Sequence, residues 1–386
     1  MTATSTTDTP YRLARPVWAE VSLDAITRNL AAIRKLAGRA VKVIATVKAN
    51  AYGHGAAAVG LHLQRLGVDG FATANLDDAV DMRRAGVTAP IVMFASNLPD
   101  GIPELLAHRL TPTVQDLATA RVISKAAGSP INVHVKVDAG LGRLGVKLSD
   151  ASRFIADISR IPNIRVEGLY THLPFGDAAG AEWSRRHLLE FTDLVETVER
   201  EQGIGIDYAQ AAASAILAGS LPDALNTVAP GHLLFGLSPV AHKSPTDLGL
   251  HPALHAIKAR LIHIATHGAG DDLALTYGYA IAQRTRTGVF LLGLDNGLRM
   301  PPTGSAWVLC GGQRCRILSV TAEYTVIDLS ALTQAAVGDE ITVLGRDGTD
   351  EIKIEEVAGY LGLSPTLAAL TLRRIPISYI TAPAIP

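Results

Sequence analysis

The chain has 386 residues, which suggests two or three domains, and its 35 lysines and arginines nearly balance its 36 aspartates and glutamates. A net charge of −1 excludes a protein that binds nucleic acid, or an anionic membrane surface, mainly through its charge. With 48% hydrophobic and 18% charged residues, the chain can bury a large core, and it contains no run of about 20 apolar residues that would span a membrane.

Residues 1–15 are predicted to form a loose tail, because the opening MTATSTTDTP is polar and lacks the basic start and apolar run of a signal peptide. Two cysteines, Cys310 and Cys315, are too few for a zinc cluster or a disulfide framework, so no metal site is expected. One disulfide between them stays open, but a reducing, cytoplasmic location fits the low cysteine count.

Residues 16–243 alternate short apolar runs with amphipathic helical patterns. The apolar runs, which predict buried strands, are 41–48, 70–75, 90–96, 132–138 and 165–172. Helices are predicted from Ser22 to Gly38, from about 149, and from about 180 to 201. Repeated strand–helix units predict a parallel sheet in an α/β fold, and eight units closed into a (β/α)8 TIM-like barrel fit the length. An open doubly wound sheet is the alternative.

Residues 244–386 have a different pattern, with short β-rich runs separated by glycine, proline and aspartate turns. This composition predicts a second, mostly β domain at the C-terminus.

Lys48 stands at the end of the first buried run, where an ammonium group is costly to bury. Such a lysine either extends into solvent or has a lowered pKa that suits Schiff-base chemistry. It begins the run KANAYGHG (48–55), which resembles the pyridoxal-phosphate signature of the alanine racemase family, the fold-type III pyridoxal-phosphate enzymes. The resemblance implies that Lys48 forms a Schiff base with pyridoxal 5′-phosphate and that Tyr52 binds the phosphate of this cofactor.

The resemblance continues in VHVKVDAGLGRLGV (133–146), which is similar to the next motif of that family. It implies that Arg143 contacts the phenolic oxygen of the cofactor and the carboxylate of the substrate, a role for which a planar guanidinium is suited. Lys136 matches a lysine that is often carbamylated in the family, where it orients the arginine. The glycines of this motif also fit a dinucleotide fingerprint, but they lie four strands into the pattern, so no dinucleotide is expected.

Four further matches complete the predicted site. His172 corresponds to the active-site histidine of the family, and Ser214 and Gly231 correspond to its phosphate-binding serine and glycine. In the second domain, Thr276-Tyr277-Gly278 matches the approach to the second catalytic residue. The resemblance therefore implies a homodimer with shared active sites, in which Tyr277 acts from the partner subunit.

Several positions depart from the family pattern. Ala229 stands where the family has an arginine facing the pyridine nitrogen of the cofactor, and Gln210 and Ala213 replace a histidine and an asparagine near Ser214. A phosphate-binding tyrosine aligns with about Pro365. Glu323 replaces a methionine, which puts a charge either in the substrate pocket or on a solvated rim.

The sequence therefore predicts a pyridoxal-phosphate-dependent amino-acid racemase or epimerase. Lys48 and Tyr277 would serve as two bases on opposite faces of a small amino-acid substrate, with His172 and Arg143 in support. The alternative is another reaction on an amino acid with the same cofactor, namely decarboxylation, retro-aldol cleavage, elimination or group transfer in specialised metabolism. A third hypothesis is a non-catalytic homologue that binds the cofactor.

Overall fold

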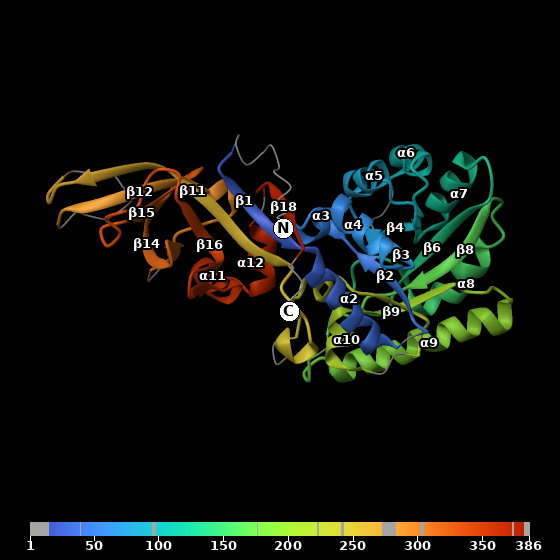
Figure 1. Ribbon diagram of the computed structural model, residues 1–386. Helices are drawn as coiled ribbons and strands as arrows, with labels where there is room; N and C mark the ends of the chain where they lie inside the picture. The colour runs from blue at the N-terminus through green and yellow to red at the C-terminus, as the bar shows by residue number, and fades with distance from the viewer. Residues whose placement is uncertain are drawn as a thin grey trace, which may run out of the picture. The chain divides into compact units, whose positions relative to one another are not determined.

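The computed structural model describes residues 15–38, 40–94, 98–175, 177–221, 224–240, 243–271, 283–301, 305–372 and 374–381. These residues form two compact units (Figure 1). One comprises Ala25–Pro252, and the other joins the described residues up to Asp24 to those from Ala253 onward.

Eight parallel strands form the centre of the first unit: β2 (Lys42–Thr46), β3 (Gly70–Thr73), β4 (Ile91–Met93), β5 (Thr113–Val114), β6 (Ile131–Asp138), β8 (Ile164–Tyr170), β9 (Tyr208–Ala213) and β10 (Thr227–Ala229). Hydrogen bonds connect them in the order β4-β3-β2-β10-β9-β8-β6-β5. A parallel bridge between Val92 and Thr111 then joins β4 to the residues before β5 and closes the ring. The predicted eight-stranded barrel is thereby confirmed, and the open sheet is excluded.

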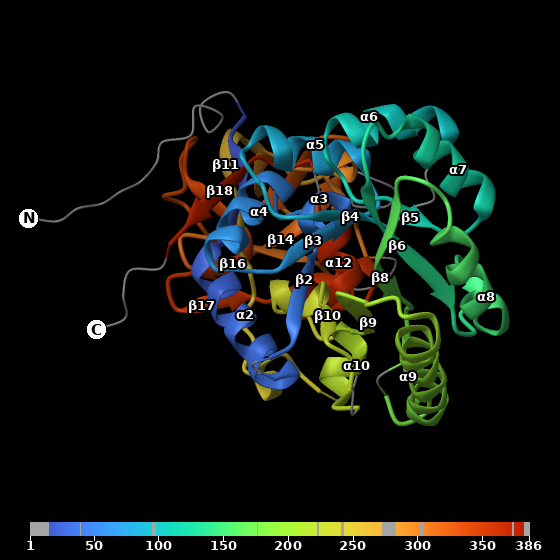
Figure 2. The ribbon, with the colours of Figure 1, turned by 90° about the vertical axis from the view of Figure 1, so that its right-hand side faces the viewer.

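Helices surround these strands, as Figure 2 shows. They are α2 (Leu23–Ala37), α4 (Ala56–Arg65), α5 (Leu76–Arg84), α6 (Ile102–Ala107), α7 (Leu117–Ala126), α8 (Leu148–Ile158), α9 (Ala181–Gln202) and α10 (Ser214–Gly219). Their apolar stripes face the sheet; in α2 the buried residues include Ile26, Leu30 and Ile33, four and three positions apart. The three helices predicted from the sequence are present, and each predicted strand overlaps an observed one.

The second unit is mostly β, as predicted. Its strands are β1 (Val17–Ser22), β11 (Leu254–His267), β12 (Thr285–Leu291), β13 (Trp307–Cys310), β14 (Gln313–Val320), β15 (Tyr324–Asp328), β16 (Glu340–Asp347), β17 (Asp350–Ile352) and β18 (Ile377–Ile380). Helices α11 (Ile354–Leu361) and α12 (Pro365–Thr371) follow β17. Its core buries Phe290, Ile317 and Ile341 among many aliphatic side chains.

The boundary between the units differs from the predicted one. Strand β1 pairs antiparallel with β11 and parallel with β18, so the chain begins in the β-rich unit and enters the barrel only after Asp24. The predicted barrel range 16–243 therefore starts too early and ends before Pro252. Hydrophobic periodicity reports burial but not the pairing partner, which here lies more than 200 residues away along the chain.

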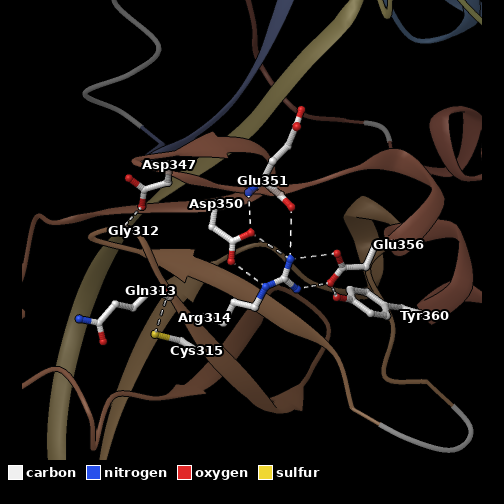
Figure 3. A network of polar contacts seen from close by, with 9 residues as sticks. All are labelled: Gly312, Gln313, Arg314, Cys315, Asp347, Asp350, Glu351, Glu356 and Tyr360. Carbon is white, nitrogen blue, oxygen red and sulfur yellow. Dashed lines mark hydrogen bonds and ion pairs between the residues drawn. The ribbon is translucent and has the colours of Figure 1, made fainter. Parts of the chain in front are cut away.

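A network of charged side chains joins β14, β17 and α11 within the second unit (Figure 3). The Arg314 guanidinium lies 2.8 Å from a carboxylate oxygen of Asp350 and 2.6 Å from one of Glu356. The hydroxyl of Tyr360 donates to Glu356 as well. Nearby, Cys310 and Cys315 are buried free thiols, which removes the disulfide that the sequence left open. Within the described residues, every helix is too short or too polar to cross a membrane.

Candidate active site

The carboxyl ends of the barrel strands carry most of the predicted site residues. Lys48 follows β2, Lys136 lies near the end of β6, His172 follows β8, and Ser214 follows β9. Gly231 comes two residues after β10. Because parallel strands in a closed barrel all end at the same face, these residues are brought to one mouth, the usual place of catalysis in such barrels.

The backbone after Lys48 turns in the left-handed sense. Ala49, Asn50, Ala51 and Tyr52 have φ between 53° and 54°, a conformation that costs L-residues roughly 1–2 kcal/mol each. The sequence predicted a strand through Lys48, but β2 ends at Thr46. The turn, labelled α3 (Lys48–Tyr52), begins at Lys48. The turn matters because it carries both the lysine and the tyrosine of the predicted cofactor site.

Two neighbouring side chains hold this turn. The Asp78 carboxylate accepts the Asn50 N–H at 2.9 Å. The Nδ1 of the buried His54 lies 3.0 Å from the carbonyl oxygens of Ala51 and Tyr52, so the neutral ring carries its proton on Nδ1. Burial lowers the pKa of His54 to about 4, so the ring stays neutral at neutral pH. Strain at a functional site is thus offset by contacts from outside the turn.

Tyr52, Ser214 and Gly231 lie together in a small cradle. A Cβ atom built on Gly231 would come within 2.3 Å of the Tyr52 hydroxyl oxygen, so only glycine permits this approach. The Gly231 N–H donates to Ser214 Oγ at 2.9 Å. Burial raises the pKa of Tyr52 above its usual value, which keeps the hydroxyl protonated as a donor. A cradle of hydroxyl and N–H donors suits a phosphate.

Basic groups gather beside this cradle. Partial burial by the barrel wall, and then the positive charge of Arg143, lower the pKa of Lys48, although the residue is exposed to solvent at the mouth. Burial, together with Arg143, lowers the pKa of the buried Lys136 to about 7, while Asp138 acts in the opposite direction. Burial and the surrounding cations, Lys136 first, lower the pKa of His172 to about 4. The site therefore offers two amines of lowered pKa and an excess of positive charge for an anionic ligand.

Arg143 lies on a short loop after β6, and residues of this loop and of the end of β6 hold its backbone in place. The Asp138 carboxylate accepts the N–H groups of Gly140 and Gly142 at 3.0–3.1 Å. Gly145, with φ of 120°, packs so closely on the end of β6 that a Cβ atom would lie 2.7 Å from the Asp138 backbone nitrogen. The loop is thus a compact support for the guanidinium rather than a dinucleotide site.

Ala229, the departure at the predicted pyridine-nitrogen position, lies in an apolar cluster inside the barrel. Ile44, Ala72 and Val92 are its buried partners.

Two predicted residues are not among the described residues of the barrel unit. Tyr277 lies outside the described residues. Glu323 is in the second unit, at an exposed turn between β14 and β15. One residue was missed: His232 follows Gly231, and its ring centroid lies 5.0 Å from that of Tyr52. Its position in the sequence, directly after the Pro-Gly motif predicted to bind phosphate, could have indicated that it lies at the site.

Comparison with known proteins agrees with the fold. Residues 21–239 match the alanine racemase N-terminal domain, and residues 254–379 match the alanine racemase C-terminal domain. The chain belongs to the alanine racemase family. An alanine racemase from Methanococcus maripaludis is 32% identical over 95% of this chain and 100% of that protein. One from Desulforamulus reducens is 32% identical over 91% of this chain and 95% of its own.

Solved structures give the same result. The alanine racemase from Bacillus anthracis with bound L-Ala-P has a TM-score of 0.85 and 28% identity, covering 95% of this chain and 96% of that one. The predictions of the family, of an isomerase that acts as a racemase, and of pyridoxal 5′-phosphate as cofactor are confirmed. The residues present fit this cofactor, because an amine of lowered pKa at Lys48 lies beside a cradle that a Cβ atom on Gly231 would fill.

Proposed function

We propose that this enzyme racemises a small amino acid, with alanine as the first substrate to test. The observation that carries the proposal is the position of Lys48, an amine of lowered pKa at the barrel mouth beside the phosphate cradle of Tyr52, Ser214 and Gly231. The names of the relatives support alanine as the substrate. Buried free thiols at Cys310 and Cys315 support a cytoplasmic location.

When bound, pyridoxal 5′-phosphate withdraws electrons from the α-carbon of the amino acid. The chain supplies the rest. Lys48 would hold the cofactor through its amine, and as a free amine it would take or return the α-proton on one face of the substrate. Arg143 pairs with the substrate carboxylate, and the loop that Asp138 holds keeps the guanidinium in place. His172, neutral because of its lowered pKa, adds no further positive charge near Lys48.

Inversion at the α-carbon requires a second base on the opposite face, and we propose Tyr277 of the partner subunit for this role. The match of Thr276-Tyr277-Gly278 to the family pattern supports it. A homodimer with shared sites follows. Mixed Lys48→Ala and Tyr277→Phe dimers would then recover activity, because one of the two hybrid sites contains both wild-type residues. Demonstrated subunit exchange without recovery would refute a shared site.

We propose that Lys136 is carbamylated. Its pKa of about 7 leaves much of the amine neutral at physiological pH, and a neutral amine adds to carbon dioxide with loss of a proton. The carbamate would replace a buried cation beside Arg143 with an anion that attracts the guanidinium. The ammonium of Lys136 would repel the Arg143 guanidinium, whereas the carbamate would attract it and so orient this substrate-binding arginine.

Ala229 supports a second candidate, namely a different reaction of the same cofactor on an amino acid. An alanine cannot supply the cation that the family resemblance implies opposite the pyridine nitrogen, so the ring would accept electrons more readily if that nitrogen is protonated. Replacing Ala229 by arginine tests the point: racemisation should rise relative to any side reaction. Unchanged rates would remove this argument. Glu323→Gln tests in the same assay whether that carboxylate influences the choice of substrate.

Borohydride reduction of the loaded enzyme, followed by peptide mapping, tests the core of the proposal. A pyridoxyl group on Lys48 is the expected result. A label on another lysine, or no label, would contradict the assignment.

A further inference from the structure

His232 lies inside the phosphate cradle in sequence and in space. The N–H of the residue before it and the N–H of Leu233 after it both reach Ser214 Oγ, at 2.9 and 3.4 Å. Its imidazole ring lies 5.0 Å from the ring of Tyr52, centroid to centroid, at an interplanar angle of 59°. The His232 ring therefore lies against Tyr52, and the backbone on either side of it contacts Ser214; the family resemblance assigns both residues to phosphate binding.

The electrostatic surroundings of His232 favour an anion. The titratable groups that face it are Lys48, His172 and Tyr52, of which the first carries positive charge when protonated and the other two are neutral at neutral pH. Burial, and then the charge of Lys48, lower the pKa of His232 to about 4. The half-buried ring is therefore neutral at neutral pH, and a neutral imidazole still has one N–H group that can donate to a phosphate oxygen.

We propose that the His232 side chain donates a hydrogen bond to the phosphate of the cofactor, beside Tyr52 and Ser214. This inference rests on the assignment of pyridoxal 5′-phosphate to the barrel. It extends that assignment, because it makes His232 a binding residue for a phosphate monoester in this chain.

The test compares two aldehydes that differ only in the phosphate. Dissociation constants of pyridoxal 5′-phosphate and of pyridoxal are measured by absorbance for wild type, His232→Leu and His232→Gln. Loss of a hydrogen bond to a charged group should weaken binding of the phosphate ester by roughly 10- to 100-fold in His232→Leu and less in His232→Gln, which keeps a donor. Binding of pyridoxal should change by less than about two-fold, because pyridoxal has no phosphate for His232 to contact. Both ligands attach to Lys48, so the ratio of their dissociation constants isolates the contribution of the phosphate.

His62→Leu is the matched control, because His62 is also half-buried in the barrel unit but contacts Thr27 Oγ1 at 2.8 Å on the outer helices. It should leave the ratio of the two constants unchanged. Equal weakening of both ligands in His232→Leu, or no weakening, would overturn the inference.

A second readout needs no variant. In ¹⁵N spectra of histidine-labelled protein, the ring signals of His232 should shift with pyridoxal 5′-phosphate but not with pyridoxal, and identical shifts would overturn the inference. Failure of the proposed function is distinguishable from failure of this inference. An enzyme that binds the cofactor at Lys48 yet turns over no amino acid would refute the function, while the ratio of dissociation constants still decides the role of His232.

Discussion

The contact between Gly231 and Tyr52 gives a sharp prediction about cofactor affinity. In Gly231→Ala, the new Cβ atom would lie 2.3 Å from the Tyr52 hydroxyl oxygen, 2.9 Å from Cζ and 3.1 Å from Cε2. Ordinary contact begins near 3.4 Å, so the hydroxyl must move by about 1 Å. Tyr52 is 3% exposed and its ring packs on His232 and Phe235. The ring therefore has little room to move, and any shift would displace the hydroxyl from the cradle.

The size of the effect follows from the hydrogen bond that Tyr52 would no longer make. A bond from Tyr52 to a charged phosphate is worth about 1.5–3 kcal/mol, which corresponds to a roughly 10- to 150-fold rise in the dissociation constant of pyridoxal 5′-phosphate. The φ of Gly231 is −122°, so the left-handed region that favours glycine plays no part. The predicted weakening is therefore steric in origin.

The assay is an absorbance titration of the apoenzyme, with thermal unfolding measured in parallel. Gly205→Ala is the neutral control, since no atom lies within 4 Å of its Cβ position. Gly168→Ala is the steric control, because its Cβ atom would meet the His134 ring at 2.6 Å elsewhere in the barrel. It should lower thermal stability but not the preference for phosphate ester over pyridoxal. A folded Gly231→Ala enzyme with wild-type affinity would refute the phosphate cradle.

Three further predictions concern Lys136, His54 and Arg314. With ¹³C-bicarbonate, the enzyme should show a carbamate resonance that strengthens as the pH rises through about 7 and is missing in Lys136→Arg; the same resonance in the variant would exclude this site. Because His54 has a pKa of about 4 when folded and about 6.5 when unfolded, the unfolded state takes up its proton first. The free energy of unfolding should then fall by up to about 3 kcal/mol as the pH drops from 6.5 to 4. The free energy of unfolding should depend less steeply on pH in His54→Asn. An unchanged pH dependence would show that other titratable groups cause it. Arg314→Gln should destabilise the β-rich unit by about 1 kcal/mol in denaturant unfolding, mostly at low salt, since the guanidinium is about one-third exposed; no salt dependence would argue against an ionic origin.

Much of the barrel, and the candidate residues of its site, could be predicted from the sequence, because both correspond to short local sequence patterns. Buried parallel strands are continuous apolar runs, and Lys48, Tyr52, Ser214 and Gly231 each lie in a short motif at a strand end. These predictions needed no knowledge of distant contacts.

The remaining features depend on contacts between distant parts of the chain. The left-handed turn after Lys48 contains two alanines that by themselves favour a right-handed helix, and it persists through bonds from Asp78 and His54. Strand β1 reads like any barrel strand, yet its partners are β11 and β18. His232 stayed unnoticed because a histidine after Pro-Gly acquires meaning only once its ring is seen beside Tyr52.

The central claim is that Lys48 and its surroundings make this chain an amino-acid racemase. Proton NMR of the cofactor-loaded enzyme with L-alanine in D₂O, followed by chiral analysis, tests it most directly. The account predicts loss of the α-proton signal together with the appearance of D-alanine, and neither change in Lys48→Ala. Exchange with retained configuration, or conversion of a panel of amino acids to amines, aldehydes or keto acids, would contradict it and point to the different chemistry that Ala229 suggests.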